Sequence, residues 1–459
     1  MKIKRILCMA TAAAIGASLA GCGGKTNVAE SDVTTITVWT TDSHTKTTIE
    51  RLVDDFNENE GKAEGIKIDY QVIEGNAFKK SLELALQTGQ GPDLIPPALG
   101  IETMVDKGYI AALDDLPGSA DFIAKYKDQL VNKRHTYNGK IYAVPRIVTT
   151  RGLIYNKDMF KAAGIVDENG EPTPPETFDE MREYAKKLTD KSNNKFGVIF
   201  PMKWDGWVGS DIITMLQSSV GHREWDFANK RFDCSGLAPI INSYMGMIDD
   251  GSAYPGSEGI DNDTARAYFA EGLIGMKIAY SFDVGVLNDQ FPAKCDWGVA
   301  PLPVIDKDNR YMQIETTQSS FFVNAASVDT KGGDKLMKCV EWFSSDDFMT
   351  TMYKEGLAIP ADYELIKDIE PDSSKKGWKE FAGMQQISNA SKPHPSVDMT
   401  GYALLSDRIK NDVLSGNVSA EDMLRQYDED AMKAAEKYYE LHTEESLDDY
   451  ADPTWDLRR

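Results

Sequence analysis

Two short stretches of the chain place aromatic rings beside carboxylates. The segment Pro201–Gly209 (PMKWDGWVG) carries Trp204, Asp205 and Trp207, and Ser281–Asp283 (SFD) follows a run typical of a strand. An aromatic face packs on the C–H-rich face of a sugar ring, and a planar polar side chain pairs with its hydroxyls. These residue types could bind a small hydroxyl-rich molecule such as a sugar; the alternative is that Phe282 and the tryptophans belong to the core.

A third candidate group follows the first predicted strand, where Trp39, Asp42 and His44 stand close together. A loop after a strand is where open α/β sheets place ligand contacts, so Asp42 or His44 could touch a ligand. The alternative is structural: Asp42 or Thr45 would cap the next helix, and Trp39 would be half-buried.

Arg146, Thr149 and Arg151 lie on an extended run that Pro145 interrupts. A guanidinium on such a run could bind a pair of sugar hydroxyls or the carboxylate of an acidic sugar. It could equally pair with an Asp elsewhere in the fold. The sequence leaves these readings open.

Strand and helix patterns alternate along the first part of the chain. The runs Thr34–Thr40 and Ile66–Ile73 are typical of strands, and Thr45–Asn59 and Asn76–Thr88 have the apolar spacing of helices. This βαβ order predicts an α/β fold with a parallel sheet. A chain of 459 residues is too long for one ordinary core and suits two domains.

Composition excludes several classes of function. The net charge of −23 argues against nucleic acid as a partner. No GxSxG, HExxH or P-loop pattern occurs, and the five histidines are scattered, so no cofactor and no metal are expected. Cys234, Cys295 and Cys339 favour buried free thiols, although one disulfide is possible.

The N-terminus has the order of a processing signal. Lys2, Lys4 and Arg5 precede an apolar stretch that ends in Leu-Ala-Gly-Cys at Cys22. This resembles the lipobox of bacterial lipoproteins, in which residues 1–21 are removed and Cys22 is lipidated. Residues 22–32 are small and polar and suit a flexible tether.

Six separated stretches resemble, in the same order, motifs of the bacterial extracellular solute-binding proteins of ABC importers. They are Gln87–Ile95, Gly152–Phe160, Glu271–Ala279, Trp297–Pro303, Phe321–Ser327 and Gly356–Ala361. The resemblance implies an α/β, periplasmic-binding-protein-like fold (type II) with discontinuous lobes and a three-segment hinge. By position, we expect one lobe from residues 33–148 and 316–361 and the other from 149–315 and 362–459.

The same resemblance implies which residues bind ligand. A tryptophan of the 204–207 loop and Phe282 would stack on it, Asp283 could accept hydroxyl protons, and Met399 and Tyr402 would start a helix that contacts it. The implied protein is not an enzyme. It would be a monomer, lipid-anchored on the extracytoplasmic face of the cell membrane, which captures a mono- or oligosaccharide and delivers it to ABC permease subunits.

The run Leu94–Gly100 lacks the aromatic and acidic residues expected for maltodextrin specificity, so the sugar class stays open. Two alternatives also stay open. One is the same role for an acidic sugar, a phosphate ester or another non-sugar solute. The other is a secreted glycosidase, which would need a pair of carboxylates about 5–10 Å apart.

Overall fold

The structure is a computed structural model, and it describes residues 33–42, 45–73, 78–371, 374–390, 392–395, 397, 401–443 and 445–459. The predicted signal peptide, the lipidation site Cys22 and the tether lie outside the described residues. So do two predicted site residues, His44 and Met399.

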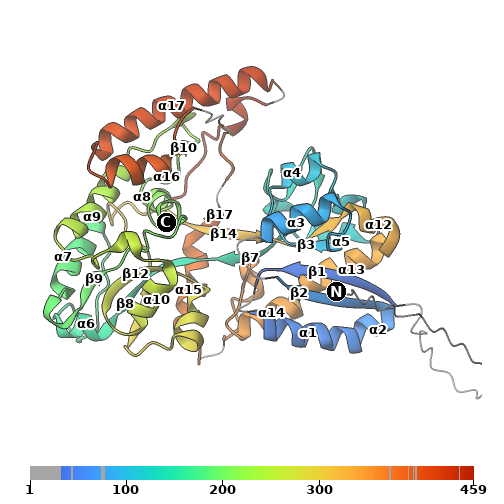
Figure 1. The fold of residues 1–459 in the computed structure, drawn as a ribbon, viewed down its shortest axis with the longest axis horizontal. Coiled ribbons are helices and arrows are strands. Elements are labelled where there is room, and N and C mark those ends of the chain that lie inside the picture. The colour runs from blue at the N-terminus through green and yellow to red at the C-terminus, as the bar shows by residue number, and fades with distance from the viewer. Residues whose placement is uncertain are drawn as a thin grey trace, which may run out of the picture.

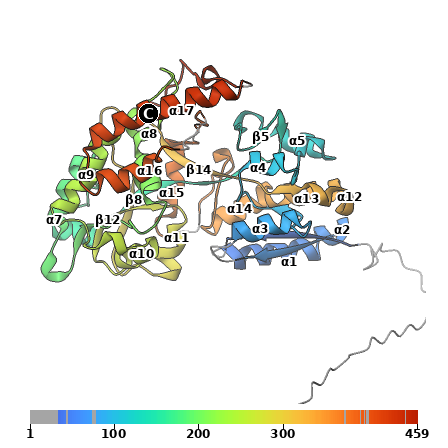
Figure 2. The same cartoon turned by 45° about the horizontal axis from the view of Figure 1, so that its top comes forward.

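The chain forms two lobes that lie side by side and are joined by extended strands (Figure 1, Figure 2). The N-terminal lobe is built on a five-stranded sheet in the order β2-β1-β3-β15-β4. Its strands are β1 (Thr34–Thr40), β2 (Ile66–Val72), β3 (Leu94–Ile95), β4 (Ile110–Ala111) and β15 (Phe322–Asn324). The predicted parallel βαβ order is confirmed, since β1 pairs in parallel with β2 and β3. The later strand β15 runs antiparallel to β3 and β4.

Helices cover this sheet with the apolar stripes that the sequence predicts. Helix α1 (Lys46–Glu58) buries Ile49, Val53 and Phe56, which recur at helical spacing. The other helices of the lobe are α2 (Glu60–Glu64), α3 (Phe78–Gln87), α4 (Ile101–Asp106), α5 (Ser119–Ala124), α12 (Ala325–Lys331), α13 (Gly333–Phe343) and α14 (Asp346–Lys354). A small hairpin, β5 (Thr136–Tyr137) with β6 (Lys140–Ile141), precedes the passage to the second lobe.

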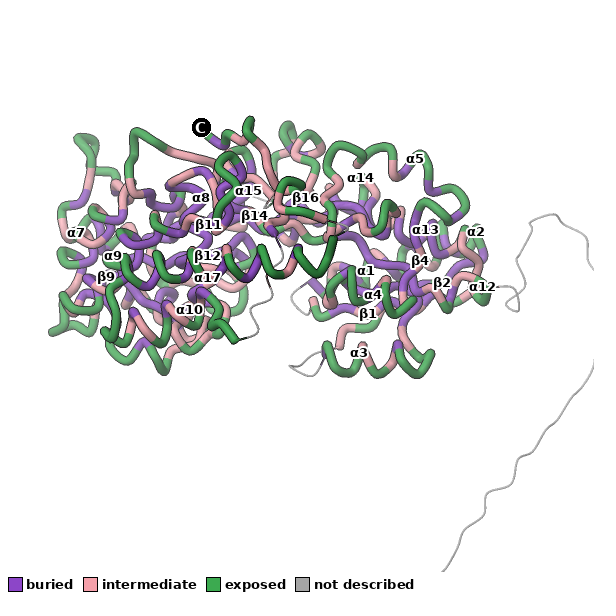
Figure 3. The backbone as a smooth tube through the Cα atoms, turned by 90° about the horizontal axis from the view of Figure 1, so that it is seen from above, coloured by how far each residue is buried: buried purple, intermediate pink, exposed green. Residues whose placement is uncertain are grey.

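The C-terminal lobe has a four-stranded sheet in the order β13-β8-β12-β9. These strands are β8 (Arg151–Asn156), β9 (Phe196–Val198), β12 (Ile274–Tyr280) and β13 (Trp297–Ala300), and a hairpin of β10 (Trp225–Asp226) and β11 (Arg231–Phe232) lies apart from them. Its helices are α6 (Lys157–Ala162), α7 (Phe178–Leu188), α8 (Met215–Val220), α9 (Leu237–Asp249), α10 (Asn262–Ala270), α11 (Asp283–Gly285), α15 (Trp378–Gly383), α16 (Leu405–Arg408) and α17 (Ala420–Leu441). Buried segments run through the middle of each lobe (Figure 3).

A third sheet lies between the lobes, in the order β16-β7-β14-β17. It comprises β7 (Pro145–Thr149), β14 (Gln313–Ser319), β16 (Ile359–Pro360) and β17 (Ser388–Ala390). After Thr150, β7 continues into β8 of the C-terminal lobe, while β14 leads into β15 of the N-terminal lobe. We call this the hinge sheet, because it carries the chain between the lobes.

The hinge sheet has two faces, which the strand register defines. Thr316 pairs with Thr149, and Thr317 pairs with Val148. Successive side chains of a strand point to opposite faces, so the two pairs lie on opposite sides of the sheet. We call the side that carries Thr149, Thr316 and Gln318 the front face, and the side that carries Val148, Glu315 and Thr317 the rear face.

The three described cysteines are free thiols. Cys234 and Cys339 are buried and Cys295 is half-buried, in accord with the predicted free thiols. Among the residues that the structure describes, no helix is both long and apolar enough to cross a membrane.

Candidate functional site

Three aromatic rings of the C-terminal lobe form a ladder next to the hinge sheet. Tyr280 and Phe282 stack with their planes 6° apart and their centroids 5.2 Å apart. Trp204 meets Tyr280 edge-on, at 6.3 Å and 90°. Phe282 is 39% exposed and Trp204 is half-buried, whereas Tyr280 is buried between them. The ladder therefore presents two of its three rings to solvent.

Buried charged groups hold Tyr280, the middle ring of the ladder. The Tyr280 hydroxyl donates to Asp211 Oδ1 at 2.6 Å, and the Tyr280 amide donates to Asp283 Oδ2 at 3.0 Å. Burial raises the pKa of Asp211 to about 6, although the Lys277 ammonium and the Tyr280 hydroxyl oppose this rise. The bond of its hydroxyl restricts the Tyr280 ring, against which Phe282 and Trp204 pack.

Asp283 holds a structural position rather than a ligand-facing one. Its side chain is 1% exposed and accepts from Arg266 Nε at 2.7 Å. Arg266 also donates to Asp263 and lies over the Phe282 ring at 5.5 Å. Both Asp283 oxygens are thus bonded within the lobe, and the predicted ligand contact of Asp283 stays a prediction.

Arg151 connects the ladder to the hinge sheet. It is 6% exposed, its Nη1 donates to the Ile314 carbonyl at 2.7 Å, and its Nη2 donates to Thr316 Oγ1 at 3.0 Å. The guanidinium lies over the Tyr280 ring at 5.5 Å. Arg151 is thus a brace between β8 and β14, and its predicted ligand contact stays a prediction.

Arg146 is likewise structural, in the N-terminal lobe. Its Nε donates to the Phe343 carbonyl at 2.8 Å, and its guanidinium lies over the rings of Phe321 and Phe348, at 5.6 and 5.5 Å. Burial lowers the pKa of this guanidinium, and Asp42 offsets part of the effect. Arg146 also lines a cavity of about 70 Å³ together with Thr149 and Phe282, and its contact with a ligand stays a prediction.

The two tryptophans of the 204–207 loop have different environments. Trp207 is 1% exposed and packs on Phe200 and Tyr244, with centroid distances of 5.7 and 6.1 Å. It belongs to the core of the C-terminal lobe, so of the two tryptophans Trp204 is the better candidate for the predicted stacking on a ligand. Trp204 keeps an accessible edge, and Asp205 beside it is exposed.

Residues of both lobes and of the hinge sheet line a small cavity on this side. It holds about 70 Å³ and is lined among others by Asp42, Thr149, Ser281, Phe282 and Gln318. Asp42 is half-buried, and its carbonyl accepts from Thr45 Oγ1 at 3.2 Å. The cavity thus brings Asp42 together with Thr149 and Phe282, which lie 107 and 240 positions further along the chain.

The remaining described residues of the prediction, Trp39 and Tyr402, do not line this cavity. Trp39 is half-buried, and its Nε1 donates to Gln71 Oε1 at 3.1 Å. Tyr402 is 40% exposed, directly after undescribed residues. The sequence reasoning did not single out Tyr280 or Gln318. The spacing of Tyr280 and Phe282, two apart at a strand end, could have indicated that their rings share one side.

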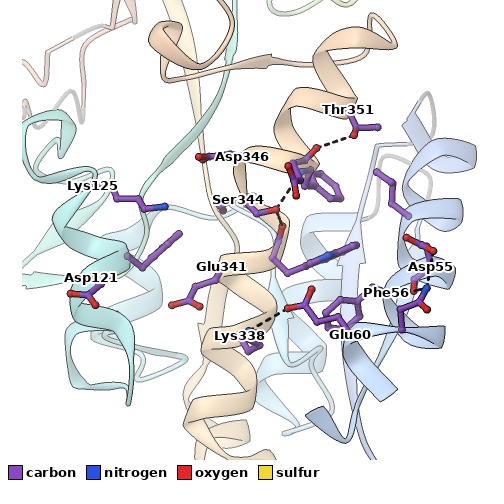
Figure 4. Close-up of a pocket in the computed structure, with 17 residues that line it drawn as sticks. Asp55, Phe56, Glu60, Asp121, Lys125, Lys338, Glu341, Ser344, Asp346 and Thr351 are labelled. Carbon is purple, nitrogen blue, oxygen red and sulfur yellow. Dashed lines mark hydrogen bonds and ion pairs between the residues drawn. The ribbon is translucent and has the colours of Figure 1, made fainter. Parts of the chain in front are cut away.

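A larger hollow of about 900 Å³ lies on the outer side of the N-terminal lobe. Figure 4 shows Asp121 and Lys125 on one side of helix α13, and Asp55 and Glu60 on its other side. This hollow surrounds a helix ridge within a single lobe and carries charges of both signs. It has no part in a site between the lobes.

One group of described residues has the spacing of metal ligands. Donor atoms of His222, Asp226 and Asp233 lie within 4.8 Å of one another. Both carboxylates are already used in the fold: Asp226 accepts from Asn229, and Asp233 accepts from Arg231 and Ser235. The group fits a turn-stabilising network of the β10–β11 hairpin.

Comparison with known proteins gives one family for the chain. The family described as "Bacterial extracellular solute-binding protein" matches residues 41–351. The maltotriose-binding protein of Pyrococcus abyssi is 26% identical over 363 residues, covering 78% of this chain and 73% of that protein. The galactooligosaccharide-binding protein of Bacillus subtilis is 24% identical over 452 residues, covering 91% of this chain and 94% of that protein.

The fold is also that of a solved sugar-analogue receptor. The GacH receptor of Streptomyces glaucescens, solved unliganded and with acarbose, superposes with a TM-score of 0.66. It shares 19% sequence identity and covers 88% of this chain and 99% of its own. At this identity the likeness shows the fold alone, and it confirms the predicted two-lobed α/β architecture.

Proposed function

This chain belongs to the family of bacterial extracellular solute-binding proteins, and from that premise we propose that it captures a carbohydrate between its two lobes for an ABC importer. Membership makes it a binding protein rather than an enzyme. The glycosidase alternative is therefore set aside.

The observation that carries this proposal is the fixed aromatic ladder beside polar groups of the hinge sheet. Phe282 and Trp204 offer ring surface to the C–H-rich part of a sugar. Thr149 and Gln318 on the front face, with Asp42 from the other lobe, offer hydroxyl, amide and carboxylate groups to its hydroxyls. This combination is the chemistry of a site that orients a hydroxyl-rich ring.

Three further residues, together with Asp42, complete the proposed site. Trp39 and Asp42 would approach the ligand from the N-terminal lobe, and Asp205 and Tyr402 from the C-terminal lobe. Each is exposed or half-buried in the structure, so each can gain contacts when the lobes move together.

The named ligands of the relatives support a carbohydrate over other solutes. One relative is a maltotriose-binding protein, another a galactooligosaccharide-binding protein, and the solved receptor holds acarbose. An anionic solute has less support, because Arg146 and Arg151 already donate to backbone carbonyls. Each of these bonds uses part of the donor capacity that an acidic sugar or a phosphate ester would need from a guanidinium.

Binding would proceed by closure of the lobes. The front cavity of about 70 Å³ is smaller than the roughly 300–1,000 Å³ of ordinary ligand pockets. A ligand that contacts both lobes only when they approach stabilises the closed form and shifts the population toward it. The closed form would then dock on the permease subunits.

We further propose the organisation and location expected from the sequence. The lobes would comprise residues 33–148 with 316–361, and residues 149–315 with 362–459. Lipidation at Cys22 would anchor a monomer on the extracytoplasmic face of the cell membrane. Mass spectrometry of protein from a bacterial host that attaches lipids tests the anchor: a diacylglycerol-sized increase should disappear in Cys22→Ser.

Thermal-shift screening of the purified protein tests the ligand class. The panel should hold mono- and oligosaccharides, uronic acids and phosphate esters. A carbohydrate at 100 times its Kd should add about 2.7 kcal/mol to the free energy of unfolding and raise Tm by several degrees. Stabilisation only by a uronate, a phosphate ester or a non-carbohydrate would overturn the proposal.

A further inference from the structure

Each of the two stacked rings of the ladder has a guanidinium over it. Arg151 lies over Tyr280 and Arg266 lies over Phe282, in both cases with 5.5 Å between the guanidinium carbon and the ring centroid. A cation over an aromatic face is attracted to the ring, and the attraction grows where water is excluded. Arg151 also braces β8 against β14, whereas Arg266 comes from helix α10.

Helix α10 gives Arg266 a fixed starting point. The N-cap residue Asp261 accepts from the Thr264 amide at 2.8 Å, which fixes the first turn of the helix. Ala265, which precedes Arg266, is buried, and so is Phe269 one turn later. The backbone from which the Arg266 side chain projects is therefore packed into the core of the lobe.

Two carboxylates hold the guanidinium itself. Arg266 Nε and Nη2 lie 2.7 and 2.6 Å from Asp283 Oδ1, and Nη1 donates to Asp263 Oδ1 at 2.6 Å. All three nitrogens of the planar group thus have a carboxylate partner. The Arg266 side chain is only 12% exposed and that of Asp283 is 1% exposed. An ion pair shielded to this degree keeps its geometry better than one on the surface.

The ring under this guanidinium has few other restraints. Phe282 is 39% exposed, and its stacking partner in the ladder is Tyr280. The Tyr280 amide donates to Asp283 Oδ2 at 3.0 Å, so the carboxylate that orients Arg266 also fixes the strand end next to Phe282. Asp283 thereby ties the guanidinium to the backbone from which the exposed ring projects.

We propose that Arg266 is a positioning residue of the binding site: its guanidinium, held by Asp283 and Asp263, fixes the Phe282 ring in the orientation that a ligand meets. The proposal rests on the proposed capture of a carbohydrate at the front face. Arg266 stays bonded to its carboxylates and acts on the ligand through the ring alone. A ring that is already in place has less freedom to lose on binding, so the affinity for ligand is higher.

Loss of the guanidinium does not leave Asp283 without a cation. The Lys277 side chain is 2% exposed, and its ammonium interacts favourably with the Asp283 carboxylate. The Tyr280 amide keeps its bond to Asp283 as well. Variants at position 266 are therefore expected to fold, and chemical denaturation of each variant checks this.

A double-mutant cycle separates positioning from general damage. Calorimetry with the carbohydrate that stabilises the protein most in the thermal-shift panel gives Kd for wild type, Arg266→Met, Phe282→Leu and the double variant. Arg266→Met should weaken binding by about threefold to thirtyfold, the range of a cation–π contact. In the Phe282→Leu background the same substitution should change Kd by less than about twofold, because the ring through which Arg266 acts is gone. Arg266→Lys keeps the charge without the planar fork and should recover only part of the loss.

A second readout needs no ligand. With 4-fluorophenylalanine at position 282, the ¹⁹F resonance reports how many orientations the ring adopts in the ligand-free protein. One narrow line is expected with Arg266 in place, and a broad or split line in Arg266→Met. Arg182→Met is the matched control, because Arg182 of α7 makes a two-pronged ion pair with Asp250 after α9, at 2.8 and 3.1 Å, in the same lobe. It should leave both the line width and Kd unchanged.

Two results would overturn the proposal. One is that Arg266→Met and Phe282→Leu have additive effects on the free energy of binding. The other is a ¹⁹F line in Arg266→Met that is single and as narrow as with Arg266 in place, whatever its chemical shift. If no carbohydrate binds the wild type, the proposed function fails, and the ¹⁹F line width still decides whether Arg266 positions the ring.

Discussion

The two faces of the hinge sheet differ in the chemistry that they offer. The front face carries Thr149, Thr316 and Gln318 next to a ladder of aromatic rings, two of which are accessible. The rear face carries Glu315 and faces the ion pair of Lys133 with Glu445. Aromatic rings and hydroxyls suit reversible binding of a ligand. A charged contact between anchored segments suits a restraint on the movement of the lobes. The two faces of the hinge sheet thus offer different chemistry, with aromatic rings and hydroxyls on one and charged groups on the other.

The largest expected effect concerns the brace of the front face. In Arg151→Met the Ile314 carbonyl and Thr316 Oγ1 lose their charged donor, and the Tyr280 ring loses its cation. The free energy of unfolding should fall by about 3 kcal/mol. Chemical denaturation measures this. Arg151→Lys keeps the charge without the planar fork and should recover only part of the loss. A loss under about 0.5 kcal/mol would show that Arg151 is not a brace.

The next effect falls on binding rather than on folding. Trp204→Ala removes an accessible ring from the front face, so carbohydrate affinity should fall roughly thirtyfold, about 2 kcal/mol. Because Trp204 is half-buried, the unfolding free energy should change far less than in Trp207→Ala, where a core ring is lost at a cost of about 3–5 kcal/mol. Calorimetry and denaturation on both variants separate the roles. Equal losses of carbohydrate affinity in Trp204→Ala and Trp207→Ala would contradict the different roles of the two rings.

The smallest effect is a pH dependence that originates on the rear face. Burial raises the pKa of Glu315 from 4.5 to about 7, although Arg134 and Arg151 favour the charged form. The folded protein therefore binds more protons than the unfolded chain between these pH values, and stability falls as pH rises through this window. Glu315→Gln should remove about 1–2 kcal/mol of this decline. Tm measured from pH 4.5 to 7.5 checks it.

Two other buried carboxyl groups keep the stability of the Glu315→Gln variant dependent on pH. Burial also raises the pKa values of Asp211 and Asp428 to about 6, so part of the slope should persist in Glu315→Gln. The test is thus the difference between the two curves. Identical slopes for wild type and variant would contradict the raised pKa of Glu315.

The sequence predicted the fold far better than the site. The segment Gly152–Phe160 indicated the family, and its helix starts as expected, with Asn156 accepting from the Met159 amide. Local patterns of this kind depend on neighbours in the chain. They carry over to the structure because capping and strand alternation are short-range effects.

The site residues were harder, because their environments come from distant parts of the chain. Arg146 and Arg151 donate to carbonyls 197 and 163 residues away, which no local pattern reveals. Trp204 and Trp207 are three residues apart, and tertiary packing alone decides that one is accessible and the other is core. Trp204 and Phe282 remain predicted ligand contacts.

One measurement tests the central account most directly: the front and rear distances taken together, with and without ligand. Labels at exposed Thr41 and Lys203 span the front, and labels at exposed Asp128 and Asp448 span the rear. On saturation with a bound carbohydrate, the front distance should shorten and the rear distance should lengthen. Binding that leaves both distances unchanged, or moves both in the same direction, would contradict closure about the hinge sheet.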